Sequence, residues 1–403
     1  MRIAMIIQRF RPAFSGQGIQ VELLSQVLAR RGIDVSIITA ADGRDRSVER
    51  LEGYSVIRVG ADPPGFLPAR WRQRLRGAEF AARVFSFLKS DRSYDVIHVH
   101  ALTDALYGSY AWCWWSQVPL VFEMTLLGVD DASTLLRTQH RFAWLRRRIV
   151  RRCDGYVTLS PALQERYCEA GLPPAKLRLV PQGVDVRRFA PSESKLVVRQ
   201  ALGLPTHKPV IVFVGSLIHR KGIDVLLRAW PEVCAARPEA RLVLVGRNQF
   251  LERSADARFL EQQLAQVPAG AQSKVHQVGV CDDVDRWLQA ADLFVFPSRR
   301  EGFGTVMIEA MACGLPCIVT EQPGITDFIF GAAGDRGVVV PQENHAALAA
   351  AVLEMLRHPE RAAKIGLAAR DDVIRRFDIE QISARYVDYY TDLIAGVKTS
   401  LGV

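Results

Sequence analysis

Short apolar runs alternate with longer amphipathic stretches along the whole chain. The runs I-A-M-I-I (3–7) and V-S-I-I-T (35–39) flank a segment from about Ile19 to Arg31 in which apolar residues recur at helical spacing. Near-continuous apolar strands separated by helices are typical of βαβ units, whose parallel sheet is covered on both faces. Further strands of this first series are predicted at 94–100, 119–125 and 154–160.

A second series of the same kind follows a polar interruption, R-R-F-A-P-S-E-S-K (187–195). Its predicted strands are P-V-I-V-F-V-G (209–215), A-R-L-V-L-V-G (240–246), K-V-H-Q-V-G (274–279), A-D-L-F-V-F-P-S (291–298) and P-C-I-V-T (316–320), and an amphipathic helix is predicted at 379–394. A chain of 403 residues favours two domains. The pattern therefore predicts an α/β protein with two doubly wound parallel sheets, in domains 1–190 and 205–375, followed by a C-terminal segment 376–403.

Composition narrows the class of protein. Hydrophobic residues make up 49% of the chain and charged residues 24%, which is typical of soluble globular proteins. The seven cysteines include no C-x-x-C, so neither a disulfide framework nor a zinc knuckle is predicted, and a reducing cytosol is favoured. The apolar run before Arg9 is too short for a signal sequence, and the segment 101–122 is too polar for a membrane span.

The positive charge is concentrated in the first half of the chain. Residues 1–190 hold 28 Lys and Arg against 18 Asp and Glu, whereas residues 191–403 hold 24 against 25. The densest segments, 69–76 and 137–152, mix arginine with Trp, Phe, Leu and Ile at helical spacing. This pattern suits an anionic membrane surface or a phosphorylated partner, and equally a solvated basic face over a core stripe. No nucleic-acid reading motif accompanies the charge, so nucleic acid is not expected as a partner.

Glycines that follow the strands mark the places where a ligand is expected to bind in an open α/β sheet. After the first strand, S-G-Q-G-I-Q-V (15–21) has G-x-G without the third glycine of the dinucleotide fingerprint. The second strand ends at Thr39 rather than at an acidic residue. Both features disfavour a hydride-transfer enzyme.

The segment E-G-F-G-T-V-M-I-E-A (301–310) carries the clearest chemistry. Its glycines let the backbone approach a ligand, and a helix that starts near Gly304 directs unpaired N–H groups and its positive dipole end at an anion, most naturally a phosphate. Along a helix, the carboxyl groups of Glu301 and Glu309 are expected to lie roughly 8–12 Å apart. That separation excludes a shared metal and exceeds the about 5–5.5 Å of a retaining glycosidase pair. It suits a ligand with a central diphosphate and hydroxyl-bearing sugars at both ends.

At this point the sequence resembles a known family. S-x-x-E-G-F-G-x-x-x-x-E-A-M-A-x-G-x-P (298–316) is similar to the two-glutamate signature of retaining glycosyltransferases of the GT-B fold, particularly family 4. Other segments resemble that family in order along the chain: A-R-R-G-I-D-V (29–35), Y-D-V-I-H-V-H-A (94–101), L-V-P-Q-G-V-D-V-R-R-F-A-P (179–191) and F-V-G-S-L-I-H-R-K-G-I-D-V-L-L (213–227). The resemblance implies two Rossmann-like domains, with the nucleotide sugar in the C-terminal half, the acceptor in the N-terminal half and a last helix that crosses back to the first domain.

The resemblance also implies roles for individual residues. Glu301 would contact the transferred sugar, Glu309 the ribose, and Lys221 would neutralise the leaving diphosphate, which makes Glu301 and Lys221 the expected catalytic residues. Gly16 would approach the diphosphate from the N-terminal domain. The full set of expected donor-binding residues is Gly16, Gly215, Ser216, Arg220, Lys221, Gly246, Glu301, Gly302, Phe303, Gly304, Thr305 and Glu309. Because a fixed cation and a helix N-terminus already supply positive charge, neither a metal nor a cofactor is expected.

The chain departs from the family pattern at several positions. Ser216 stands where the family often has a phosphate-binding Arg, and Thr125 stands where many members have a His. Gln182 replaces the Asn of the interdomain element, and Ser15 replaces one glycine of a Gly-Gly pair. We therefore expect sugar or acceptor positioning to involve Thr125, Glu123 or His100, or Asp130 in place of the missing His. His100 has the alternative of being a satisfied structural histidine.

The function predicted on this basis is retaining transfer of a sugar from a UDP- or GDP-sugar to a hydroxyl. The basic N-terminal half favours a lipid-linked saccharide or surface-polysaccharide precursor as the acceptor, at the cytoplasmic face of the cell membrane. Two alternatives remain open: a nucleotide-sugar 2-epimerase of the same architecture, and a catalytically silent nucleotide-sugar-binding protein.

Overall fold

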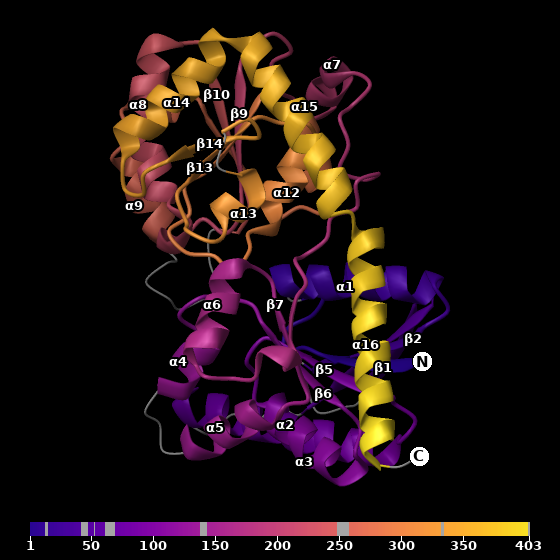
Figure 1. Ribbon diagram of the computed structural model, residues 1–403. Coiled ribbons are helices and arrows are strands. Elements are labelled where there is room, and N and C mark those ends of the chain that lie inside the picture. Colours follow the sequence, from indigo (N-terminus) through magenta and orange to yellow (C-terminus); the bar gives the residue numbers. More distant parts are fainter. Residues whose placement is uncertain are drawn as a thin grey trace. The chain divides into compact units, whose positions relative to one another are not determined.

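The computed structural model describes residues 1–12, 15–41, 47–51, 53–60, 69–137, 143–247, 258–331 and 334–401, with the side chains of 69–74, 143 and 397–401 left aside. The chain divides into two compact units (Figure 1). Unit 1 comprises Met1–Gly183 and Ile379–Val403, and unit 2 comprises Val184–Asp378.

Unit 1 is built around a sheet whose inner strands are apolar and buried. Its strands are β1 (Arg2–Ile6), β2 (Asp34–Ala40), β3 (Ser47–Leu51), β4 (Tyr54–Val59), β5 (Val96–His100), β6 (Leu120–Met124), β7 (Gly155–Thr158) and β8 (Leu177–Leu179). Its helices are α1 (Gly16–Arg30), α2 (Ala69–Ser90), α3 (Ala105–Ser116), α4 (Ala132–Arg137), α5 (Ala143–Arg152), α6 (Pro161–Glu169), the 3-10 turn η1 (Pro174–Lys176) and α16 (Ile379–Leu401).

The sheet of unit 1 has the order β3-β4-β2-β1-β5-β6-β7-β8. All neighbouring strands run parallel except β3 and β4, which form an antiparallel pair at the edge. The predicted parallel sheet is therefore confirmed, while the edge hairpin was not foreseen. Burial of every residue of β5 and β6 explains their unbroken apolar pattern, since helices cover both faces of such strands.

Unit 2 repeats the architecture. Its strands are β9 (Val210–Val214), β10 (Arg241–Val245), β11 (Val275–Gly279), β12 (Leu293–Phe296), β13 (Cys317–Thr320) and β14 (Val338–Val340). Its helices are α7 (Lys195–Ala201), η2 (His219–Lys221), α8 (Ile223–Ala236), α9 (Phe259–Ala265), α10 (Ala269–Gln272), α11 (Val284–Ala290), α12 (Thr305–Ala312), α13 (Thr326–Phe330), α14 (His345–Arg357) and α15 (Pro359–Arg376).

The sheet of unit 2 is parallel throughout, in the order β11-β10-β9-β12-β13-β14. This is the order of a doubly wound fold, and the strand sequence reverses between β9 and β12. The predicted second doubly wound sheet is confirmed. In unit 1 the corresponding reversal lies between β1 and β5.

The last helix, α16, packs within unit 1 alongside α1 (Figure 1). Its tyrosines are buried, and the hydroxyl of Tyr389 lies 3.1 Å from the carbonyl oxygen of Lys176. At the solvent edge, Glu380 forms ion pairs with Arg30 and Arg31.

The division between the units falls earlier than the range 190–205 considered from the sequence. Residues after Gly183 belong to unit 2 because they bond to it. The Val184 amide donates to the carbonyl of Phe377, and Arg188 forms an ion pair with Asp285. The polar composition of this segment reflects solvent exposure of its side chains rather than a lack of fixed contacts.

Within the described ranges, none of the helices combines the length and the apolar character that crossing a bilayer requires. The segment 101–122 contains the short helix α3 and the start of β6.

Candidate functional site

The reversal of strand order in unit 2 places two loops next to each other. β9 and β12 are hydrogen-bonded neighbours, so the segments that follow their carboxyl ends meet at one edge of the sheet. We call the segment His219–Gly222 the lysine turn and the segment Ser298–Gly304 the glutamate loop. Ligands of doubly wound folds bind at this place.

The lysine turn and the glutamate loop hold each other through the backbone. The Arg299 amide donates to the carbonyl of Arg220 at 2.9 Å, and the Arg299 guanidinium pairs with Asp224 at 2.7 Å. Gly222 has a φ of +71°, and a Cβ there would lie 1.8 Å from the Pro297 carbonyl oxygen. Only glycine allows the two segments to approach this closely.

Glu301 lies in a buried ion pair at this junction. Its Oε1 accepts from the Lys221 ammonium at 2.6 Å and from the Ser298 hydroxyl at 2.5 Å, and its Oε2 lies 3.4 Å from Arg220 Nη1. Burial alone would raise the pKa of Glu301, but the charges of Lys221 and Arg220 outweigh it and hold the pKa below its usual value. The pKa of Lys221 is lowered by burial and by Arg220, against the opposing effect of Glu301. The side chains of Lys221 and Glu301 are 14% and 7% exposed.

The glutamate loop ends at the start of α12. Gly304 has a φ of +88° and is the N-cap residue of α12, so the cap residue itself supplies no side-chain hydrogen bond. Phe303 anchors the loop because its ring is buried against Phe377, with the ring centroids 5.6 Å apart. Gly302 is buried, and Thr305 begins the helix. The first turn of α12 can therefore offer its N–H groups to an anion.

Glu309 lies further along α12 in a separate electrostatic environment. Burial raises its pKa to about 7, with the nearby Arg188 lowering it and Asp285 raising it. These neighbours differ from those of Glu301, so the two glutamates do not share a proton or a cation.

Two further glycines end strands at the same edge. Gly215 and Gly246 have φ values of +149° and +140°, and a Cβ on Gly246 would lie 2.0 Å from the Gly215 carbonyl oxygen. Ser216 follows β9 and is buried, in the place where an arginine was expected by resemblance. Arg220 reaches Glu301 instead, so one guanidinium is present near the expected position of the phosphate.

In unit 1, the expected residues lie at the corresponding edge. Gly16 opens α1, where Ser15 caps the helix by accepting from the Gly18 amide at 3.1 Å. Apart from its chain neighbours and its own helix, none of the described residues has a heavy atom within 4 Å of a Cβ placed on Gly16. The Thr125 hydroxyl donates to the Asp130 carboxylate at 2.6 Å. The same carboxylate accepts from the Thr125 and Leu126 amides of this loop. Burial raises the pKa of Asp130 to about 6, against hydrogen bonds from Thr125 and Leu126 that lower it.

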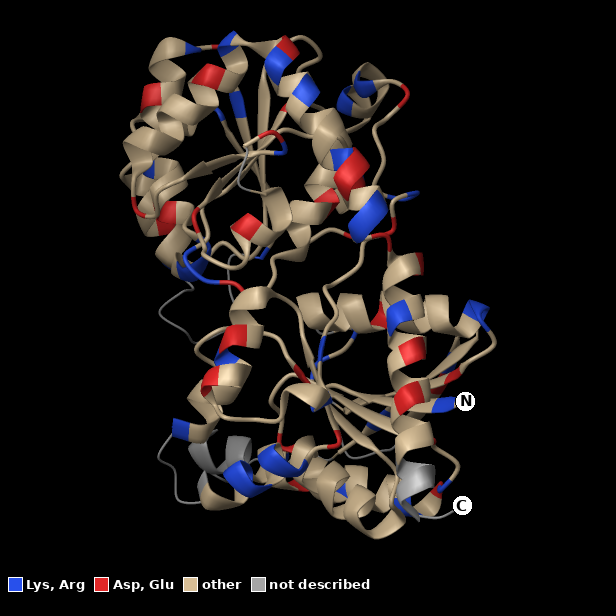
Figure 2. Cartoon of the chain, in the orientation of Figure 1, with Lys and Arg blue, Asp and Glu red and all other residues tan. Residues whose placement is uncertain are grey.

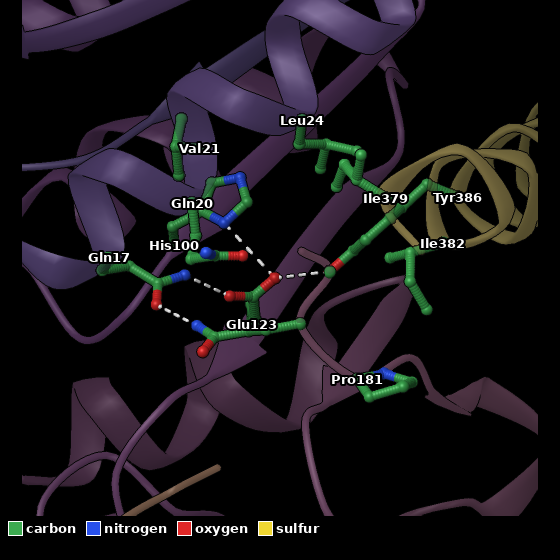
Figure 3. A pocket seen from close by; sticks show the side chains of 12 residues that line it. Gln17, Gln20, Val21, Leu24, His100, Glu123, Pro181, Ile379, Ile382 and Tyr386 are labelled. Carbon is green, nitrogen blue, oxygen red and sulfur yellow. Dashed lines mark hydrogen bonds and ion pairs between the residues drawn. The ribbon is translucent and has the colours of Figure 1, made fainter. Parts of the chain in front are cut away.

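His98, His100 and Glu123 form a compact buried group in unit 1, which we call the His–Glu cluster. The two histidines are on β5, and Glu123 is the partner of His100 on the adjacent β6. The Glu123 carboxylate accepts from Gln17 at 2.5 Å and from the Tyr386 hydroxyl at 2.8 Å. Figure 3 shows Gln17, His100 and Tyr386 directed at Glu123 in one pocket. Burial, with a smaller effect from His100, lowers the pKa of His98 well below its usual value.

Sequence reasoning overlooked several contributors. Ser298 was quoted only as part of the motif, yet its hydroxyl bonds to Glu301, and Tyr386 and Tyr390 contact the His–Glu cluster from α16. The spacing of three residues from Ser298 to Glu301 was the available local signal. Nδ1 of His100 lies 3.3 Å from Oε2 of Glu123, and neither ring nitrogen makes a hydrogen bond to a described residue.

Comparison with known proteins matches both halves of the chain. The family model described as "Glycosyltransferase Family 4" matches residues 14–188, and the one described as "Glycosyl transferases group 1" matches residues 194–372. A GDP-mannose-dependent monoacylated alpha-(1-6)-phosphatidylinositol monomannoside mannosyltransferase of Corynebacterium glutamicum is 34% identical over 217 residues, which are 51% of this chain and 54% of that protein. A D-inositol 3-phosphate glycosyltransferase of Kineococcus radiotolerans is 28% identical over 391 residues, which are 88% and 85% of the two chains.

Solved structures share the fold along nearly the whole chain. Sucrose-phosphate synthase from Thermosynechococcus elongatus superimposes with a TM-score of 0.80 at 24% identity, covering 98% of this chain and 99% of that one. Anabaena Alr3699/HepE, solved in complex with UDP-glucose, gives a TM-score of 0.78 at 21% identity, covering 97% and 100%. At these identities the likeness shows a common fold.

Proposed function

The chain belongs to the family 4 glycosyltransferases and has the GT-B fold, and from this premise we propose that it transfers a sugar, with retention, from a UDP- or GDP-sugar to a hydroxyl group. The observation that carries the proposal is the Lys221–Glu301 ion pair beside the uncapped start of α12. It brings a cation, a sugar-binding carboxylate and helix N–H donors to the switch point of one sheet.

The ion pair changes partners in the proposed reaction. In the free enzyme Lys221 and Glu301 neutralise each other at 2.6 Å. When the donor binds, the ammonium of Lys221 turns to the diphosphate, and the carboxylate of Glu301 accepts hydrogen bonds from the sugar. The amides of Phe303 and Gly304, with Thr305, bind the diphosphate or the sugar, and Glu309 accepts from the ribose. Because Gly215 and Gly246 have no side chain, the backbone at these residues can approach the donor. The assignment of Gly16 to donor binding stays a prediction.

The bond changes of the proposed transfer need neither a nucleophile nor a base from the protein. The bond between the anomeric carbon and the leaving phosphate oxygen breaks, and the acceptor oxygen bonds to the same face of that carbon. The acceptor proton passes to the leaving phosphate oxygen. Positive charge fixed where negative charge develops stabilises this transition state, so Lys221, Arg220 and α12 supply what a divalent metal supplies elsewhere.

We assign the acceptor to unit 1, and within the acceptor class we favour a lipid-linked saccharide or surface-polysaccharide precursor. The pocket of unit 1 is lined by apolar side chains such as Leu24 and Ile382 and by polar ones, among them Gln17, His100 and Glu123, which offer hydrogen-bond partners to a hydroxyl of the acceptor. Thr125 serves this purpose less directly, because Asp130 already holds its hydroxyl.

The surface of unit 1 supports a peripheral association with anionic membrane at the cytoplasmic face. Lys and Arg cluster on α5 (Figure 2), where Trp144 is 63% exposed. On α3, Trp114 and Trp115 are 67% and 51% exposed. Large aromatic side chains beside arginines suit the lipid headgroup region. Residues 138–142 and the side chains of 69–74, which belong to the basic segments noted in the sequence, lie outside the described part.

Membrane association can be tested with the intact protein. Phosphatidylglycerol vesicles should bind it at low salt, and phosphatidylcholine vesicles or high salt should release it. Trp144→Ser should weaken binding, whereas Leu367→Ser, at an equally exposed apolar position in unit 2, should not. Failure of the unchanged protein to bind anionic vesicles at low salt would end the membrane proposal and leave the transfer proposal intact.

The transfer reaction needs its own test. UDP, GDP and ADP should be compared by thermal shift, because a nucleotide at 100 times its Kd stabilises the native state by about 2.7 kcal/mol. Donor turnover should then be measured with and without acceptor. An epimerase converts donor alone, a silent binding protein converts none, and a transferase requires the acceptor. Glu301→Ala should abolish turnover with little change in fold, and unchanged turnover would contradict the site.

A further inference from the structure

Three buried imidazole nitrogens of the His–Glu cluster make no hydrogen bond to the residues that the structure describes, although two of them face Oε2 of Glu123. They are Nε2 of His98 and both Nδ1 and Nε2 of His100, in side chains at most 2% exposed. Buried polar atoms are nearly always paired with protein or with a bound water or ion, so several orphans at one place call for a ligand. The same carboxylate faces both rings.

The distances within the cluster match those between ligands of one metal ion. Oε2 of Glu123 lies 3.7 Å from His98 Nε2 and 3.3 Å from His100 Nδ1. All three ligand atoms lie within 4.8 Å of one another. Zinc–nitrogen and zinc–oxygen bonds of about 2.0–2.1 Å place tetrahedral ligands roughly 3.3 Å apart.

The surroundings orient these ligands as a metal site requires. Nδ1 of His98 lies 2.6 Å from the Tyr390 hydroxyl, which leaves Nε2 for a metal. Gln17 and Tyr386 hold the two oxygens of Glu123 from opposite ends of the chain. Hydrogen-bond partners behind the metal ligands, such as these tyrosines and this glutamine, fix the tautomer of a histidine and the direction of each ligand.

Two members of the cluster border a small cavity, which His98 does not line. His100 and Glu123 line the pocket of Figure 3, which has a volume of about 20 Å³, and a water needs about 10–15 Å³. Neither Lys nor Arg appears among the described residues that line it. A divalent cation would balance the buried carboxylate.

We propose that His98, His100 and Glu123 bind one Zn²⁺ ion in unit 1, with its fourth position open to the pocket. Two histidines and one carboxylate are a known ligand set for zinc. The ion ties β5 and β6 to α16 through the contacts of Tyr386 and Tyr390. The zinc site shares His100 and Glu123 with the pocket assigned to the acceptor, and it does not depend on the diphosphate site of unit 2.

The test uses the full chain without an affinity tag. Protein stripped with a chelator and dialysed against micromolar Zn²⁺ should retain one zinc per chain, and its melting temperature should rise. Co²⁺ in place of Zn²⁺ should give visible absorption bands of a four-coordinate site. Zinc content near zero, or no cobalt spectrum, would overturn the proposal.

Variants locate the site. Glu123→Gln and His100→Gln should each abolish stoichiometric zinc retention, whereas Glu165→Gln and His207→Gln, at exposed positions, should leave it unchanged. Tyr390→Phe keeps all three ligands, and it should weaken zinc binding by about 10-fold or more. If a ligand variant fails to fold, X-ray absorption of the unchanged zinc protein decides: two imidazoles in the first shell support the site, and their absence refutes it. Retention of zinc by both folded ligand variants also refutes it.

Discussion

The Lys221–Glu301 pair offers a sharp test of the electrostatics of the donor site. Breaking a buried ion pair by removing one partner leaves an uncompensated charge and typically costs about 3–5 kcal/mol. For Lys221→Met we expect the lower end, about 3 kcal/mol, because Arg220 and the Ser298 hydroxyl still contact Glu301. For Glu301→Gln we expect about 2 kcal/mol, since the ammonium is 14% exposed and keeps some access to water.

The double variant separates a coupled pair from two independent losses. With Lys221→Met and Glu301→Gln combined, no charge is stranded, so the total loss should be about 3 kcal/mol rather than the sum of about 5. The coupling energy is then about 2 kcal/mol, within the range found for residues in contact.

Hydrogen exchange of the amides in 293–312 measures this local stability without assuming that two units unfold together. A loss of about 3 kcal/mol corresponds to roughly 100-fold less protection. Lys195→Met is the matched control, because its ammonium pairs with Asp292 at 43% exposure and should cost at most about 1 kcal/mol. Losses that add within about 0.5 kcal/mol would refute the reasoning.

Three further changes probe the same unit. Burial raises the pKa of Glu309 from 4.5 to about 7, so the free energy of unfolding should fall by roughly 3 kcal/mol as pH rises from 4.5 to 8. Denaturation at several pH values should show that Glu309→Gln flattens this dependence. Parallel pH curves for the variant and the parent protein would contradict the prediction. Gly304→Ala should lower the free energy of unfolding by about 1–3 kcal/mol, because φ is +88° and the new Cβ would lie 2.5 Å from Met307 Cε. Calorimetry should also show weaker nucleotide binding. An unchanged melting temperature and unchanged binding would argue against a strained helix start. Ser298→Ala should lower kcat/KM about tenfold by removing one hydrogen bond to a carboxylate, and steady-state kinetics equal to those of the parent would show that Ser298 does not position Glu301.

The element pattern was readable from sequence wherever burial is uniform. β5, β6, β9 and β12 are buried along their length, and each appeared as an unbroken apolar run. β3 was missed because its residues are mostly exposed and carry no such run. The helix after Gly304 was predicted within a residue, since the glycines and the following apolar periodicity are both local signals.

The residues of the candidate site also differ in how far sequence could identify them. The two glutamates and the phosphate-binding helix start lie within nine residues, so spacing alone argued that they serve different parts of one ligand. The partner of Glu301 could not be found by spacing, because Lys221 is 80 positions away. His98 and Tyr390 are separated by 292 positions.

The sequence by itself determined the alternation of strands and helices, the family signature and the helix start that we propose binds an anion, because each depends on residues within a few turns of one another. Only the tertiary structure decided that Lys221 neutralises Glu301 and that α16 reaches the histidines of β5. Those contacts follow from strand order, which puts β9 beside β12 and β1 beside β5, and from the packing of the last helix on unit 1. Such order arises from the burial of whole sheet faces, which no local pattern of residues specifies.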